Sequence, residues 1–179
     1  MRQPPTSPSS ILGDLDLHLL GEGNHRRLWE VLGPQLMGPG ASGEGSVHFA
    51  VWAPNASSVA VVGDWNGWQA EPMTMIEAEG PTGIWSVVCP AARSGHHYKY
   101  EIVSATGRTL RKADPMARHT EAPPSDASVV PAPSAHVWTD ESWMASRIAT
   151  LEGTAPMRLY EVHLASWKNG VSTWDDLAQ

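Results

Sequence analysis

The chain has 179 residues, of which 41% are hydrophobic, and a formal net charge of −7. This length suits one or two domains with a hydrophobic core. The acidic balance implies no affinity of the whole chain for nucleic acid or acidic membranes, and no apolar run approaches the roughly 20 residues that span a bilayer. The single cysteine, Cys89, excludes an intrachain disulfide and suits a reducing compartment. We therefore expect a cytoplasmic protein.

The first 45 residues divide into a tail and a helical lead-in. Residues 1–14 are predicted to be a disordered tail, because they begin with a proline- and serine-rich run and lack the apolar stretch of a signal peptide. Residues 15–45 form the helical lead-in. There, Asn24 can cap a short helix, and the pair Gly33-Pro34 ends it.

Residues 46–130 carry the pattern of a β-domain. Short segments alternate between apolar and polar residues, with glycine and proline between them at near-regular spacing. This pattern is typical of an antiparallel β-sandwich. Trp52 and Trp85 stand in two of these segments, and we expect both side chains to pack inside. The predicted strands are SVHFAVWAP (46–54), SSVAVVGDWN (57–66), GIWSVVCP (83–90), HHYKYEIVSA (96–105), GRTLRKADP (107–115) and ASVV (127–130).

The stretch VVGDWNGWQ places two of the nine tryptophans around an Asn-Gly pair. The pair Asn66-Gly67 predicts a two-residue hairpin turn, because both central residues of such a turn must accept positive φ. Exposed aromatic side chains at a turn need a reason, either packing or a ligand, and a flat indole fits the apolar face of a sugar ring. For Trp65 we favour packing. For Trp68 packing and sugar binding both stay open.

The sequence changes character after the predicted sandwich. Residues 131–156 begin with proline, alanine and serine, and we expect a linker that contains one brief helix. Residues 157–179 are predicted to hold an apolar strand that includes Leu159 and Leu164, followed by the start of a helix capped by Ser172. A strand followed by an opening helix is typical of the first step of a longer βα fold.

No motif in the sequence is typical of catalysis or metal binding. The eight histidines show no metal-ligand spacing, and CxxC, HExxH, a glycine-rich phosphate loop and GxSxG are absent. We therefore predict no catalytic residue, no metal site and no cofactor. The cationic stretch from Arg93 to Arg118 has two interpretations: an ordinary solvated face, which we favour, or a polar surface for hydroxyl-rich or anionic ligands.

Several motifs occur in a recognisable order: GSVHFAVWAPNASSVAVVGDWNGW, GIWSVVCP, YKYEIVSATG, RKADPMA, ASVV and YEVHLASW. In this order they resemble the amino-terminal part of bacterial 1,4-α-glucan (glycogen) branching enzymes, which belong to the family-13 glycoside hydrolases. The resemblance extends from about Leu20 to Ala178. Its specificity lies in the combination, since no single motif is diagnostic.

The resemblance implies a fold and a parent activity. Residues 46–130 would be a family-48 carbohydrate-binding module with an immunoglobulin-like β-sandwich fold. Residues 157–179 would be a stub of the catalytic (β/α)8 barrel, whose catalytic carboxylates come from later strands. The parent enzyme would cut an α-1,4-glucan and rejoin it by an α-1,6 bond without a cofactor. We expect this chain, as a truncated piece, to be inactive, and its incomplete barrel strand to promote association.

The resemblance also assigns two glucan-binding residues. Trp68 matches a tryptophan that serves as a stacking platform, and Lys99 in YKYE matches a lysine that hydrogen-bonds sugar hydroxyls. The second platform tryptophan of glycogen-binding relatives is missing, because Thr109, Leu110 and Arg111 occupy its stretch. A platform with one indole predicts weak binding of glycogen and maltooligosaccharides.

Two alternatives stay open at this point. The chain could be a stand-alone α-glucan-binding module, although residues 157–179 would then have no use. It could also come from a debranching or trehalose-releasing relative that shares the module. A reading frame that continues beyond Gln179 would separate the branching-enzyme interpretation from the stand-alone module.

Overall fold

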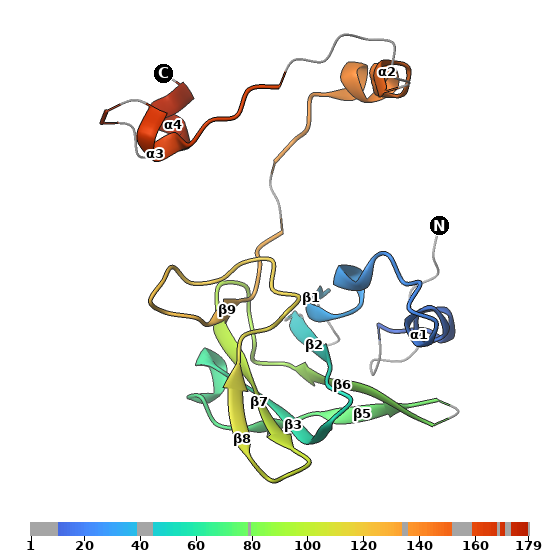
Figure 1. Ribbon diagram of the computed structural model, residues 1–179. Helices are drawn as coiled ribbons and strands as arrows, with labels where there is room; N and C mark the ends of the chain where they lie inside the picture. The colour runs from blue at the N-terminus through green and yellow to red at the C-terminus, as the bar shows by residue number, and fades with distance from the viewer. Residues whose placement is uncertain are drawn as a thin grey trace. The chain divides into compact units, whose positions relative to one another are not determined.

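The computed structural model divides the chain into two compact units, residues 1–133 and residues 134–179, which are described separately. In the first unit, strands and three short helical segments follow one another from blue to yellow in Figure 1. The second unit, in orange and red, contains only helices and irregular segments among its described residues. The residues described are 11–38, 45–78, 80–133, 136–151, 159–167, 169–170 and 173–178.

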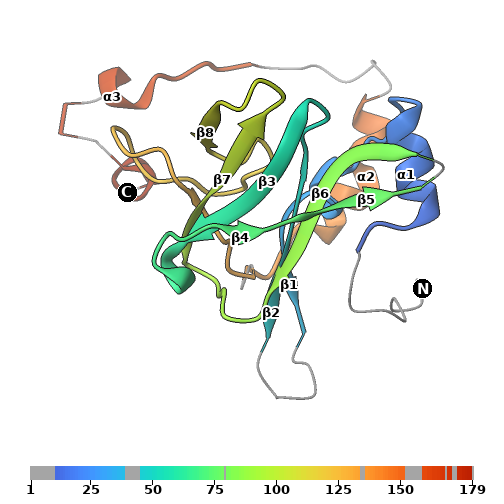
Figure 2. The same ribbon diagram turned by 90° about the horizontal axis from the view of Figure 1, so that it is seen from below.

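The first unit is a sandwich of two antiparallel sheets, which Figures 1 and 2 show from two directions. One sheet has the order β1-β2-β6-β5. The other has the order β4-β3-β7-β8, with β9 paired to β7. The predicted mainly-β fold is confirmed. The strands are β1 (Gly33–Met37), β2 (Ser46–Trp52), β3 (Ala56–Gly63), β4 (Glu71–Pro72), β5 (Thr74–Glu77), β6 (Pro81–Cys89), β7 (His97–Ser104), β8 (Thr109–Lys112) and β9 (Ser128–Val129).

The core of the sandwich follows the alternation of side chains along the strands. Phe49 on β2, Val61 on β3 and Tyr98 on β7 are fully buried and belong to one apolar cluster. Successive residues of a strand point to opposite faces, so their neighbours in sequence face away from this core. Each of the six predicted strands overlaps an observed strand, because the sequence alternation marks which face of the strand is buried.

A buried carboxylate ties the loop after β8 to this core. The hydroxyl of Tyr98 donates to Asp114 at 2.6 Å, and that of Tyr100 donates to the same oxygen at 3.2 Å. Burial raises the pKa of the Asp114 carboxyl, and the hydrogen bonds from the two tyrosines and from the Met116 amide oppose that rise. The carboxylate thereby satisfies two phenol groups that burial would otherwise leave unpaired.

The outward face of the first sheet is buried by the amino-terminal segment, and we call it the covered face. Ala50 of β2 and Ile84 of β6 pack there against Leu12, Val31 and Leu32. This segment includes α1 (Asp14–Gly21) and a one-turn 3₁₀ helix, η1 (Leu28–Glu30). Figures 1 and 2 show α1 beside the β5–β6 hairpin.

Parts of the predicted lead-in are wrong. The helix expected from Asn24 is only η1, and the expected helix stop at Gly33-Pro34 is the beginning of β1. Proline is tolerated because β1 is an edge strand, where a missing N–H need not break the ladder. The predicted tail was also too long: Leu12 is buried and α1 begins at Asp14. Residues 1–10 of that tail lie outside the described residues.

Of the two strand tryptophans predicted to be internal, one is. Trp85 is buried and its indole N–H donates to the carbonyl of Ala53 at 3.1 Å. Trp52 is 59% exposed, so that expectation is wrong. It stands at the end of β2 and lines an open groove of about 550 Å³ with Leu17 and Pro54. Outward alternation places Trp52 on the covered face, where the amino-terminal segment does not enclose it.

The second unit has α2 (Glu141–Leu151), α3 (Leu164–Trp167) and α4 (Trp174–Ala178). The brief helix expected in the linker is α2. The strand expected around Leu159 is wrong: residues 159–163 are irregular, and Leu164 begins α3. A strand needs a neighbour to accept and donate backbone hydrogen bonds, and no described strand pairs with this segment. The barrel stub is therefore not seen.

The last predicted helix is confirmed, but its cap differs. The hydroxyl of Thr173 accepts from the Asp176 amide at 3.1 Å, and the Asp176 carboxylate accepts from the Thr173 amide at 3.1 Å. This reciprocal pair is a capping box. Ser172, the predicted cap, lies outside the described residues. Among the described helices of both units, none is long and apolar enough to cross a membrane.

Candidate functional site

The connection from β3 to β4 is longer than the predicted two-residue turn. β3 ends at Gly63, and a one-turn 3₁₀ helix, η2 (Asp64–Asn66), follows. Gly67 and Trp68 then adopt left-handed conformations, with φ of 62° and 63°. The Asn-Gly pair thus marks a hairpin correctly, but its turn type was wrong, because η2 adds a helical turn before the chain reverses.

Trp65 packs inward, as expected. Its ring stacks on Phe49, with centroids 5.2 Å apart and planes inclined by 17°. The indole N–H donates to the Glu71 carboxylate at 2.9 Å. The ring also lies directly over Gly63, where an added Cβ would come within 2.2 Å of it. This indole is itself only partly buried, and it packs against the sandwich core at the end of β3.

Trp68, three residues later, is only partly buried. Its backbone N–H donates to the Gly63 carbonyl at 2.9 Å, and its indole N–H donates to Asp64 at 3.1 Å. Its carbonyl accepts from the guanidinium of Arg111 at 3.5 Å. The backbone and the indole edge are thus fixed, while the residue as a whole stays partly exposed.

Asp64 connects Trp68 to the start of β7. One carboxylate oxygen accepts from the indole of Trp68, and the other lies 2.7 Å from the His97 amide nitrogen and 2.9 Å from its Nδ1. Partial desolvation raises the pKa of Asp64, but the hydrogen bonds from His97 and Trp68 outweigh it, so the pKa lies below its usual value. The group is therefore a carboxylate, and an acceptor only, near neutral pH.

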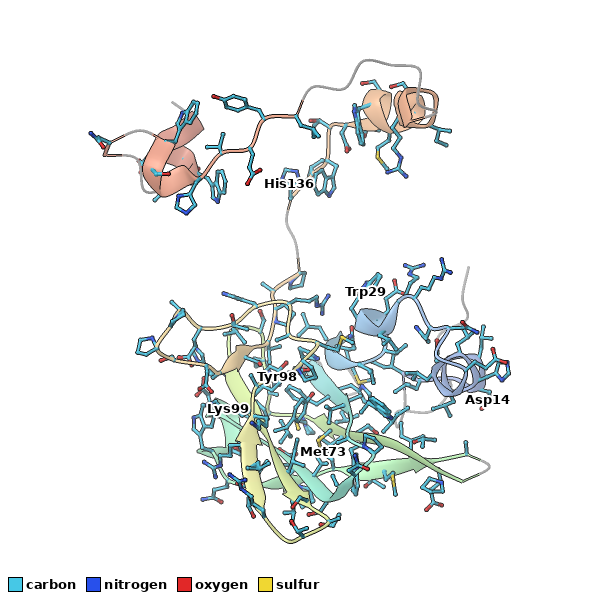
Figure 3. The ribbon with its side chains drawn as sticks, in the orientation of Figure 1. Asp14, Trp29, Met73, Tyr98, Lys99 and His136 are labelled. Atoms are coloured by element: carbon cyan, nitrogen blue, oxygen red, sulfur yellow. The ribbon has the colours of Figure 1, made fainter. Side chains whose placement is uncertain are left out.

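Lys99 lies on the outward side of the second sheet, which we call the open face. Its neighbour Tyr98, labelled beside it in Figure 3, is fully buried, so alternation directs Lys99 away from the core. Its ammonium forms an ion pair with Asp126. The hydrogen bond from Lys99 lowers the pKa of Asp126.

Arg111 stands on the same face as a second cation. It is opposite Glu101 in the β7–β8 ladder, and its Nε donates to the Glu101 carboxylate at 2.9 Å. Arg111 comes from the stretch where the expected second platform tryptophan is missing, and it contacts the backbone of Trp68 instead. On the open face, then, both Lys99 and Arg111 are matched by carboxylates.

The structure brings the two predicted site residues to the same end of one sheet. Gly63, which accepts from the Trp68 amide, is the ladder partner of Tyr98, the residue before Lys99. Sequence reasoning missed the role of Asp64 and of His97. These two residues are 33 positions apart, and no local pattern links them.

Among the described side chains, no group of three or more histidine, cysteine, aspartate or glutamate residues is placed to hold a metal ion. What the open face presents is a fixed, accessible indole, paired charges and several hydrogen-bond donors and acceptors. Stacking and hydrogen bonding are the chemistry that this arrangement supports.

Comparison with known proteins gives one family and many relatives. The model of carbohydrate-binding module 48 (isoamylase N-terminal domain) matches residues 24–117. The 1,4-alpha-glucan branching enzyme GlgB of Ralstonia nicotianae is 45% identical over 186 aligned residues, which cover 99% of this chain and 24% of that protein. The 1,4-alpha-glucan branching enzyme GlgB of Nocardia farcinica is 47% identical over 166 aligned residues, which cover 89% of this chain and 22% of that protein.

Solved structures also align with the chain. Pullulanase type I from Bacillus subtilis, complexed with maltose, has a TM-score of 0.48 and 23% sequence identity over 60% of this chain and 14% of that one. The chain spans about a quarter or less of the length of the curated relatives that it matches.

Proposed function

Because the chain belongs to the carbohydrate-binding module 48 family, we propose that its sandwich binds α-1,4-glucan on the open face, with Trp68 as the stacking surface and Lys99 as a hydrogen-bond donor. The observation that carries this proposal is the accessible indole of Trp68, whose backbone and N–H are fixed by Gly63, Arg111 and Asp64. A fixed aromatic ring loses little conformational freedom when a ligand stacks on it.

The paired charges of the open face favour a neutral, hydroxyl-rich ligand. Lys99 is paired with Asp126, and Arg111 with Glu101. An anionic ligand would have to displace these carboxylates, whereas a sugar hydroxyl can both donate to a carboxylate and accept from an ammonium or guanidinium group. This pairing supports a glucan over a phosphorylated or otherwise anionic ligand.

We expect the binding to be weak. One stacked ring contributes about 1 kcal/mol to the binding free energy, in addition to the contribution of the apolar area that it buries. Each hydrogen bond to a hydroxyl adds about 0.5–1.5 kcal/mol. A total near −4 kcal/mol corresponds to a Kd of about 1 mM. Arg111 supplies hydrogen bonds but no second indole, so it does not replace the stacking of the absent tryptophan.

The proposal extends to the parent activity. The relatives confirm the resemblance to the amino-terminal part of branching enzymes. We propose that a whole protein containing this chain transfers α-1,4-glucan segments to α-1,6 positions, and that the sandwich holds the glucan for it. An iodine-stain assay of the purified chain on amylose should show no loss of colour. A retaining mechanism needs two carboxyl groups across the scissile bond, and the resemblance assigns both of them to later strands of the barrel.

Titration with maltoheptaose tests the binding proposal. Trp68→Ala should abolish detectable binding while the protein stays folded, and Lys99→Ala should weaken it a few-fold. Trp52→Ala is the matched control, because Trp52 is a tryptophan more exposed than Trp68 but lies on the covered face, in a separate groove. Binding that survives Trp68→Ala, or that is lost with Trp52→Ala, would place the glucan elsewhere.

We further propose that the protein resides in the cytoplasm. Support comes from Cys89, the one cysteine, which is buried. Burial and the nearby Glu71 carboxylate raise the pKa of its thiol, so it stays protonated and unreactive. Fractionation of the source cells, with detection by an antibody against the chain, tests this placement.

A further inference from the structure

Trp68 occupies a backbone conformation that its residue type disfavours. Among the described residues it is the only one other than glycine with φ in the left-handed region. For an L-residue this conformation brings Cβ too close to the following carbonyl oxygen. Such residues persist only where the surrounding structure holds them, and they cluster at ligand sites.

Asp64 is the residue best placed to hold the indole. Its carboxylate accepts the indole N–H of Trp68 at 3.1 Å and is itself anchored to β7 through the amide and the imidazole of His97. His97 Nε2 lies 3.8 Å from Glu121, so the anchor continues into the loop before β9. The indole is thus connected to the second sheet by a side chain as well as by its own backbone.

We propose that Asp64 is a positioning residue for glucan binding: it fixes the ring plane of Trp68 so that the accessible part of the indole is ready for a sugar ring. This inference rests on the proposed glucan site. It adds to that site a second residue, which does not touch the sugar and acts through the indole alone. Without this hydrogen bond the ring could rotate about its side-chain bonds, and each bound sugar would have to restrict it again.

A double-mutant cycle tests the inference. Trp68→Phe keeps an aromatic ring but removes the N–H that Asp64 accepts. In the parent protein, Asp64→Ala should weaken maltoheptaose binding about fivefold, which corresponds to about 1 kcal/mol, the typical net contribution of one hydrogen bond. In the Trp68→Phe background, Asp64→Ala should change binding less than about twofold, because the contact is already gone.

The matched control is Glu71→Ala. Glu71 accepts the indole N–H of Trp65 at 2.9 Å, which is the same chemistry on the inward-facing ring. Its loss should leave maltoheptaose binding unchanged within about twofold, because Trp65 is part of the core. Equal losses of binding for Glu71→Ala and Asp64→Ala would mean that Asp64 acts on general stability, which overturns the inference.

A second measurement does not need Asp64→Ala to fold. Asp64→Asn keeps the shape of the side chain but loses its charge. The indole N–H resonance of Trp68, assigned by its disappearance in Trp68→Phe, should shift in Asp64→Asn, and the Trp65 indole resonance should not. An unshifted Trp68 resonance overturns the inference.

The outcomes separate this inference from the proposed function. If the parent protein does not bind maltoheptaose, the proposed function fails and the positioning role fails with it. If the parent binds, and Asp64→Ala weakens binding equally in both backgrounds, the glucan site stands and only the positioning role is wrong.

Discussion

The two outer faces of the sandwich differ in what they bury. On the covered face, Ala50 and Ile84 form a second apolar cluster with the amino-terminal segment. On the open face, Lys99, Glu101 and Arg111 are paired with charged partners. Val62, the ladder partner of Lys99, is buried there but belongs to neither apolar cluster. In both sheets the inward-pointing residues are apolar and form the core. The outward-pointing residues do not contact this core, so their composition can differ between the two sheets.

This difference separates stability from binding. Apolar contacts on the covered face add to the free energy of unfolding in proportion to the area that they bury. Exposed ion pairs such as Arg111–Glu101 contribute little to it. Residues on the open face can therefore change to suit a ligand with little effect on the free energy of unfolding. Substitutions on the covered face should act on folding, and those on the open face on maltoheptaose binding.

A charge placed on each face should give the largest contrast. Ala50→Lys buries an ammonium group among Leu12 and Val31. An unpaired buried charge costs several kcal/mol, so we expect a loss of about 5 kcal/mol or more, which approaches the whole stability of a typical domain. Denaturant unfolding followed by circular dichroism measures it.

Ala60→Lys is the matched control on the open face. Ala60 is partly exposed and stands opposite Glu101 in the β3–β7 ladder. A new cation there can pair with that carboxylate, so stability should change by less than about 1 kcal/mol. Comparable losses for both variants would mean that the open face is also needed for folding.

The two indoles of the β3–β4 connection repeat the contrast within four residues. Trp65→Ala removes a ring that stacks on Phe49 and should lower the free energy of unfolding by about 3 kcal/mol. Trp68→Ala removes a partly exposed ring and should cost less than about 1 kcal/mol. Melting curves of both variants, run beside the maltoheptaose titrations, test whether stability and binding reside in different rings. A Trp68→Ala variant that unfolds while Trp65→Ala does not reverses the assignment.

His48 should make the covered face sensitive to pH. It is fully buried, and neither ring nitrogen has a hydrogen-bond partner among the described residues. Burial lowers its pKa from 6.5 to about 4. Between these values the unfolded state binds a proton that the folded state does not, so stability falls as the pH drops from about 6.5 to about 4. This lowering of the pKa corresponds to roughly 3 kcal/mol of stability lost at low pH.

Unfolding free energies measured between pH 4 and pH 7 test this expectation. His48→Leu should be more stable than the parent at pH 5 and should flatten the dependence in this window, because no buried imidazole remains to be protonated. A parent and a variant whose stabilities fall in parallel would assign the dependence to other groups.

Strand positions were predictable because the alternation is local. Val47, Phe49 and Val51 mark one face of β2 within five residues, and the structure buries all three. β1 was missed because its first two residues, Gly33-Pro34, are typical of a helix stop and only the edge position of the strand makes them acceptable. The strand expected at Leu159 failed because alternation cannot supply a partner strand.

The candidate site was predictable only in part. The Trp68 and Lys99 assignments came from resemblance. Lys99 lies on the open face near the start of β7, and Trp68 is linked to the same end of the sheet through Gly63 and Asp64. Asp64 could not be recognised, because its partner His97 is distant in sequence and the contact exists only once β3 and β7 pair. Nor could the left-handed conformation of Trp68 be read from its type, since the Asn-Gly signal favoured positive φ one residue earlier.

The smallest predicted effect concerns the backbone of Trp68. Glycine accepts positive φ without the clash that a Cβ causes, so Trp68→Gly should be more stable than Trp68→Ala by about 1 kcal/mol, although both lose the indole. Trp65 has no such conformation and lies in η2, so Trp65→Gly should be less stable than Trp65→Ala by about 0.5–1 kcal/mol. Four melting curves and four maltoheptaose titrations are enough. The stability difference between the glycine and alanine variants should have opposite signs at the two positions, and both Trp68 variants should lose binding. This result would show that the tryptophan at position 68 is needed for the ligand although its backbone conformation favours glycine. The same sign at both positions would mean that the left-handed conformation relaxes once the ring is gone, and that it carries no cost for the folded protein.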